Sequence, residues 1–202
     1  MKAILALEAS SDTASVSLWR SGEVLAEVEF FSKRSLSAEL FPVLSRVLDG
    51  APPVGLIAVG LGPGSYAGVR ITIAAALGLQ CIWECEIKGI PSVAVLGAQG
   101  ESYQAIGDAR RGTWYYSQVV DGLCVNGPVL LESPEMLKSA LAKGHGPVRS
   151  TEVLQDEWGA VVSVPNASAL ARLASLGRGI VQSTDLEPLY LREPHITLPR
   201  VP

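Results

Sequence analysis

Residues 60–70 read GLGPGSYAGVR and join an apolar run at 56–61 to a long apolar stretch that begins at Tyr66. Glycines placed where a strand ends and a helix begins permit positive φ angles and let backbone N–H groups approach a ligand closely. Two interpretations are therefore open. The segment is either a loop that binds a phosphate or a fixed turn that directs the helix after it.

The turn lacks the usual signatures of nucleotide-binding loops. No Gly-Lys-Ser/Thr sequence occurs in the chain, no lysine lies near the turn, and the residues after Gly64 do not match the dinucleotide fingerprint. In the structural interpretation Pro63 and the glycines hold the turn, and Ser65 caps the following helix. A nucleotide-like site stays open as a hypothesis. Its residues are Glu8, Ser10, Gly62, Gly64 and Ser65.

Residues 66–84 are predicted to form a helix that is apolar on nearly every side, and such a helix must be covered all round. Either its outer side packs on a second protein or the helix is fully buried within the monomer. A stable interface of this kind buries ~1,200–2,000 Å² in total. Both Leu77→Arg and Ile73→Glu are expected to disrupt association. The predicted interface residues are Leu40, Arg70, Ile73, Ala74, Leu77 and Gly78.

Periodicity and turn residues predict the other elements. Expected strands cover residues 3–7, 14–20, 23–30, 56–61, 87–90, 104–107, 113–120 and 128–131. Expected helices cover 36–48, with Ser37 as a possible N-cap, 92–99, 134–142 and 168–176, the last capped by Asn166 or Ser168. This order predicts a mixed α/β fold. Because composition shifts near residues 97–104, we expect an N-terminal lobe at 1–100 and a smaller lobe at 101–202.

Composition narrows the possible functions. The chain has 202 residues, of which 48% are hydrophobic and 18% charged, and its net charge is −4. No dense Lys/Arg cluster is present, which argues against strong, direct nucleic-acid binding by this chain alone. The N-terminal apolar run is too short for a signal peptide, and the longest apolar stretch contains Arg70 and Gln80, which argues against a membrane span.

Cysteine and histidine usage argues against a metal site. Cys81, Cys85 and Cys124 have no disulfide or zinc spacing, which is typical of a reducing cytoplasm, and the first two are expected to share a helix face. His145 and His195 form no zinc motif. We therefore expect no metal and no catalytic residue in this chain.

Four stretches together resemble one protein family. Residues 62–70 resemble the Gly-Pro-Gly-Ser-Phe-Thr-Gly-Leu/Val-Arg signature of the TsaB (YeaZ) family. Residues 4–8 and 14–18 resemble that family's opening strands, residues 108–112 its Asp-Ala-Arg-x-Gly, and residues 187–192 its Glu-Pro-x-Tyr-Leu-Arg. The matches keep the family's order over nearly the whole chain.

The resemblance implies an actin/Hsp70/sugar-kinase (ribonuclease H-like) fold with two related lobes, the first carrying dimerisation helices. It implies a bacterial cytoplasmic protein that supports threonylcarbamoyladenosine (t6A) formation at position 37 of tRNA. In that family the chain is a non-catalytic scaffold. It pairs with a TsaD-type catalytic subunit and a TsaE-type ATPase, forms homodimers in isolation, and meets tRNA only through the complex. ATP and magnesium are used by the complex, with no cofactor assigned to this chain and no membrane association.

Three departures from the family pattern bear on nucleotide binding. Glu8 stands where an aspartate is common, Ala67 replaces a threonine, and Leu36 replaces a histidine. These changes weaken the case for nucleotide binding and leave the apolar helix intact, so we expect the turn to direct an interface helix. The alternatives are an ATP-binding kinase or ATPase of the same fold and a glycoprotease-like peptidase.

Overall fold

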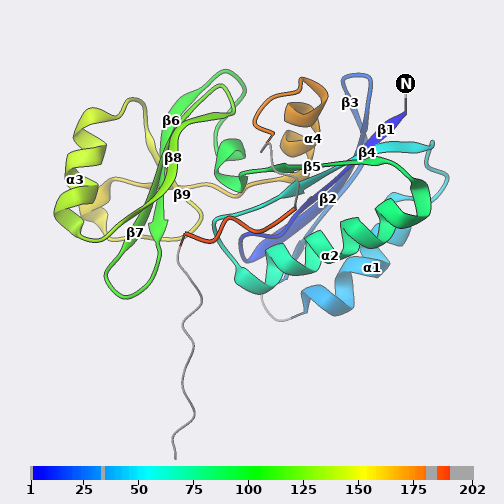
Figure 1. Cartoon of the computed structure of the whole chain (residues 1–202), viewed down its shortest axis with the longest axis horizontal. Coiled ribbons are helices and arrows are strands. Elements are labelled where there is room, and N and C mark those ends of the chain that lie inside the picture. The colour runs from blue at the N-terminus through cyan, green and yellow to red at the C-terminus, as the bar shows by residue number, and fades with distance from the viewer. Residues whose placement is uncertain (1, 33–34, 181–185, 192–202) are drawn as a thin grey trace, which may run out of the picture.

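The computed structural model describes residues 2–32, 35–180 and 186–191 (Figure 1). Two five-stranded sheets lie side by side, and helices flank them. Arg192 and His195 lie outside the described residues.

The first sheet is built from the N-terminal half of the chain and has the strand order β3-β2-β1-β4-β5. Strands β1, β2 and β3 run antiparallel in sequence order, whereas β4 and β5 continue the sheet in parallel with β1. The three strands expected at the start of the chain are therefore confirmed, and they form an antiparallel meander. The strands are β1 (Ala3–Glu8), β2 (Thr13–Arg20), β3 (Glu23–Phe31), β4 (Val54–Gly60) and β5 (Glu86–Ile90).

The second sheet repeats this topology with the order β10-β9-β6-β7-β8. Here β6, β7 and β8 form the antiparallel meander, and β9 and β10 run parallel to β6. The repeat confirms the expected fold of two related lobes. Strands β9 and β10, with three and two residues, are too short for a periodicity signal and were not predicted. The strands are β6 (Ser102–Asp108), β7 (Trp114–Val120), β8 (Leu123–Leu131), β9 (Val148–Ser150) and β10 (Val161–Val162).

Helices α1 and α2 cover one face of the first sheet, and α4 covers the other face (Figure 1). Helix α3 packs on β7 and β8 of the second sheet. Because α4 returns from the C-terminal half of the chain to the first sheet, the lobes interlock, and the boundary at residue 100 stays a prediction. The helices are α1 (Leu36–Val47), α2 (Tyr66–Trp83), α3 (Pro134–Lys143), α4 (Ala167–Ser175) and the short 3-10 helices η1 (Ser92–Val95) and η2 (Asp156–Trp158).

Strand β1 explains why its sequence reads as an unbroken apolar run. Leu5 and Leu7 join the core under α1 and α2, whereas Ile4 and Ala6 join the core under α4. A strand with helices on both sides buries every side chain, so the alternation typical of a half-exposed strand is lost.

Some local predictions are correct and others are wrong. Ser65 and Asn166 cap α2 and α4, each with its side-chain oxygen accepting a backbone N–H. Helix α1 begins at residue 36 as predicted, but its N-cap position is Ser35 and not Ser37. The predicted helix at 92–99 is one 3-10 turn. Cys85 shares no helix face with Cys81, because α2 ends at Trp83.

Candidate functional site

The glycine-rich turn between β4 and α2 uses its backbone donors internally. Gly62 N donates to Ser92 Oγ at 3.0 Å, Ser65 N donates to the Ser10 carbonyl at 2.6 Å, and Gly68 N donates to Ser65 Oγ at 3.2 Å. A phosphate-binding loop needs such N–H groups directed at the ligand. The hydrogen bonds of this turn instead fix its conformation and the direction of α2.

Glu8, at the end of β1, is fully buried beside this turn. One of its carboxylate oxygens accepts the Ser10 N–H at 2.6 Å, and the other accepts the Ser92 hydroxyl at 2.8 Å. Since Ser92 also accepts from Gly62, the carboxyl group links β1, the turn and η1. Burial raises the pKa of the Glu8 carboxyl, although the hydrogen bonds from Ser10 and Ser92 act in the opposite direction.

Glu8→Gln is expected to change how stability depends on pH. For a carboxyl whose pKa is raised by folding, the stabilising contribution is fully present below the unfolded value, near 4.5, and is lost as pH rises through the folded value. Glutamine keeps an oxygen for Ser10 and cannot ionise. The free energy of unfolding, measured by urea denaturation between about pH 5 and pH 8, should therefore fall less in Glu8→Gln than in the wild type. Glu29→Gln, at an exposed position of β3, is the control, and parallel curves for Glu8→Gln and wild type contradict the expectation.

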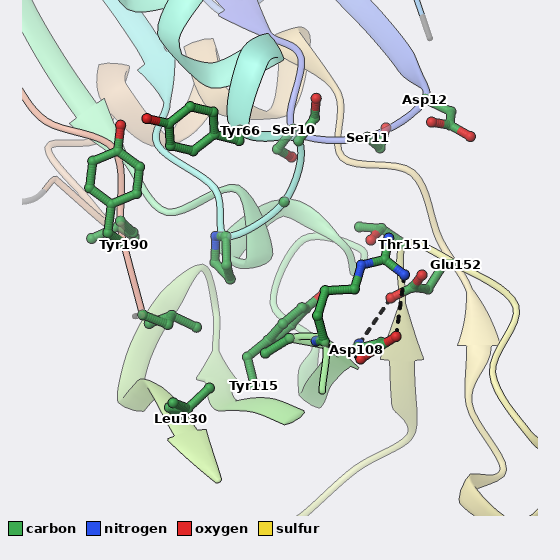
Figure 2. A pocket seen from close by; sticks show the side chains of 17 residues that line it. Ser10, Ser11, Asp12, Tyr66, Asp108, Tyr115, Leu130, Thr151, Glu152 and Tyr190 are labelled. Atoms are coloured by element: carbon green, nitrogen blue, oxygen red, sulfur yellow. Dashed lines mark hydrogen bonds and ion pairs between the residues drawn. The ribbon is translucent and has the colours of Figure 1, made fainter. Parts of the chain in front are cut away.

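A cavity of about 640 Å³ lies between the two lobes, next to the turn (Figure 2). Among the predicted nucleotide-like residues, Ser10, Gly64 and Ser65 line it. Glu8 and Gly62 do not line it, so the structure divides that set into cavity residues and residues that support the turn. Second-lobe side chains supply the opposite wall, among them Asp108, Arg110, Tyr115, Leu130, Thr151 and Glu152.

Among the described residues that line this cavity, acidic side chains outnumber basic ones. The acids are Asp12, Asp108 and Glu152, and the described cation is Arg110, which pairs with Asp108 at 3.3 Å. Glu152 accepts the Asp108 N–H at 2.9 Å. The cation of the described lining is thus already paired with a carboxylate, which does not favour phosphate groups. Within the described part of the chain, no three His, Cys, Asp or Glu side chains gather in a way that could hold a metal ion.

Helix α2 presents an exposed, mostly apolar stripe on the side that faces away from the sheet. Leu77 is 41% exposed and Ile82 is 73% exposed, while Phe41 on the neighbouring α1 is 61% exposed. We call the exposed residues on this side of α2 the α2 stripe. They are Arg70, Ala74, Leu77, Gly78, Cys81 and Ile82. The alternative prediction, that α2 is fully buried within the monomer, is therefore wrong.

Two of the predicted interface residues lie elsewhere. Ile73 and Leu40 are buried in the core that α1 and α2 form with the first sheet. A charge at Ile73 would disrupt that core, so Ile73→Glu cannot report on a partner surface. Of the described helices, α2 alone has the length and hydropathy of a membrane span, and one third of it is buried inside the protein. A single helix of this kind is weak evidence for a membrane span.

A tyrosine–arginine cluster lies where the α2 stripe meets the cavity. Tyr66 and Tyr190 lie side by side (Figure 2), with ring centroids 5.5 Å apart. The Arg70 guanidinium carbon is 5.0 Å from the Tyr66 ring centre. Tyr190 reaches α2 because Leu189 N donates to the Leu61 carbonyl at 2.9 Å. Tyr190 was not among the predicted site residues. The motif at residues 187–192 was the available signal, but nothing in the sequence shows that it lies beside α2.

Comparison with known proteins gives consistent matches. A family model described as TsaD, tRNA N6-adenosine threonylcarbamoyltransferase, matches residues 32–130. The tRNA threonylcarbamoyladenosine biosynthesis protein TsaB of Bacillus subtilis is 31% identical over 175 residues, covering 77% of this chain and 76% of the relative. The protein of the same name in Haemophilus influenzae is 26% identical, and the alignment covers 98% of this chain and 97% of the relative. A crystal structure from Pseudomonas aeruginosa is described as a protein with similarity to peptidase YEAZ. It superposes on this chain with a TM-score of 0.73 and 26% sequence identity, and the superposition covers 95% of this chain and 100% of that structure.

Proposed function

Since this chain belongs to the TsaB family, we propose that it takes part in the biosynthesis of threonylcarbamoyladenosine in tRNA as a non-catalytic subunit that pairs with a TsaD-type catalytic subunit. The observation that carries this proposal is the α2 stripe. Large exposed apolar side chains at Leu77 and Ile82, on a helix narrowed by Ala74 and Gly78, favour close packing against another helix. In isolation the same stripe supports pairing of two copies.

The turn and the cavity support a structural role for this chain in the complex. The N–H groups of Gly62, Ser65 and Gly68 bind within the protein, and the cavity beside them is rich in carboxylates. We therefore assign the use of ATP and magnesium to a TsaE-type ATPase that joins the pair, and we assign the chemical step to the TsaD-type subunit. Contact with tRNA is made through the assembled complex.

Mixing this chain with a TsaD-type protein and measuring molar mass by light scattering tests the proposal. The expected result is a complex of defined stoichiometry at micromolar concentration, with or without the TsaE-type protein and ATP. Failure to associate under every one of these conditions overturns it. Assays of the modification then test the scaffold role, since activity is expected only when both chains are present.

Binding of ATP by this chain is the second candidate function, because Ser10, Gly64 and Ser65 do line a cavity large enough for a nucleotide. Calorimetry of the isolated chain with Mg-ATP distinguishes this function from the scaffold role. We expect no binding tighter than ~1 mM, about −4 kcal/mol. Tighter binding that is lost in Ser10→Ala would favour the nucleotide-binding alternative.

A further inference from the structure

Arg70 is the single charged residue of α2, and it stands at the N-terminal end of an otherwise uncharged stripe. Any protein that covers the stripe also takes this guanidinium out of water. Removing a charge from water without giving it a partner is unfavourable, so a well-matched surface must supply an acceptor there. Arg70 therefore carries information about what kind of surface binds.

The guanidinium is already held in place before any partner arrives. One of its terminal nitrogens donates to the Tyr66 hydroxyl and lies 3.5 Å from the Tyr190 hydroxyl. Among the described residues no carboxylate forms an ion pair with it. A guanidinium has five N–H donors in a planar fork that matches a carboxylate or phosphate. The two hydroxyls use one nitrogen of the fork and leave the others for an external acceptor.

The surroundings favour a carboxylate from a protein over a phosphate from RNA. The rest of the stripe is apolar, and helix α2 has no second cation. In the described lining of the cavity next to Tyr66, the cation Arg110 is paired with Asp108 and Glu152 adds a further carboxylate, so this lining does not favour a polyanion. Nucleic-acid interfaces need several cations near one another. A single arginine within an apolar surface is, by contrast, a common feature of protein–protein interfaces, where arginine often acts as an anchor residue.

We propose that Arg70 is a specificity-determining residue of the α2 stripe, which binds a protein surface carrying an Asp or Glu side chain opposite the N-terminal half of α2. This inference rests on the proposed function and names the chemistry of the partner. Within Tyr66–Trp83 a second copy packed α2 against α2 offers no acid, and the acid that it can bring near Arg70 in an antiparallel pair is Glu84, the exposed C-cap of the helix. With Glu84 neutralised, Arg70 favours the heterologous partner over self-association.

The neutral variant Arg70→Met separates the two kinds of pairing. Methionine keeps an apolar side chain of comparable length and removes the charge. The dissociation constant for the TsaD-type subunit is expected to rise about 30-fold or more, and the salt dependence of that affinity should decrease. The dissociation constant for self-association is measured by sedimentation equilibrium in a Glu84→Gln background, which removes the acid at the C-cap of α2. In that background Arg70→Met should leave it within about threefold of Glu84→Gln alone, or improve it. Arg20→Met, at the exposed end of β2, is the matched control.

Charge reversal provides the second measurement. Arg70→Glu is expected to abolish heterologous pairing, and one Asp→Lys or Glu→Lys variant from the partner's contact face should restore it. The inference is overturned if Arg70→Met leaves heterologous affinity unchanged, weakens both kinds of pairing equally, or lowers tRNA binding by the isolated chain. These outcomes differ from failure of the proposed function, in which wild-type chains do not associate at all.

Discussion

Leu77→Arg is expected to weaken association with the TsaD-type subunit by at least ~100-fold, about 3 kcal/mol. Leu77 lies near the middle of the α2 stripe and is 41% exposed, so the arginine reaches solvent in the free chain and folding is retained. In the complex the same side chain would be buried without a partner and would clash with a surface fitted to leucine. Isothermal titration with the TsaD-type protein measures the loss.

Val153→Arg is the matched control, because Val153 is a more exposed apolar residue that lies in the second lobe, outside α2. It should bind the TsaD-type subunit like wild type. Thermal unfolding of both variants verifies that the fold is kept. If the affinity of Leu77→Arg stays within a few-fold of wild type while the wild-type complex forms, the α2 stripe is not the contact surface, and another face of this chain must carry the association.

Gly68→Ala is expected to lower the free energy of unfolding by about 3 kcal/mol, roughly 6–12 °C in Tm. Gly68 is buried in the first turn of α2, where an added Cβ atom would lie 2.0 Å from the carbonyl oxygen of Ala9. Both groups are backbone, so neither can move without shifting α2 or the loop after β1. The substitution therefore forces apart the two segments that form the turn.

Gly78→Ala on the same helix provides the contrast. A Cβ atom there meets nothing within 4 Å, and alanine favours helix by about 1 kcal/mol over glycine. The free chain should gain stability by about that amount. Equal changes in Tm for the two variants would contradict the close approach of Gly68 to Ala9. Because Gly78 also lies in the α2 stripe, partner binding is measured separately in this variant.

The amino-acid pattern was sufficient for most of the fold. Apolar runs marked β1 and β4, and alternation marked β2 and β3, because these signals depend only on neighbours along the chain. The cap at Ser65 was predictable for the same reason. Very short strands such as β9 and β10 gave no signal, since three residues do not establish a period.

Packing decided the roles of individual residues. Ile73 and Leu77 both read as apolar positions of one helix, yet the first is in the core and the second is exposed, because the sheet and α1 cover only one side of α2. The carboxylate of Glu8 reads as a possible ligand at the end of a strand, but Ser92, 84 positions later, occupies one of its oxygens. Tyr190 reaches Arg70 across 120 positions. Local sequence specifies local conformation, whereas contacts between distant segments exist only once the sheets and helices have assembled.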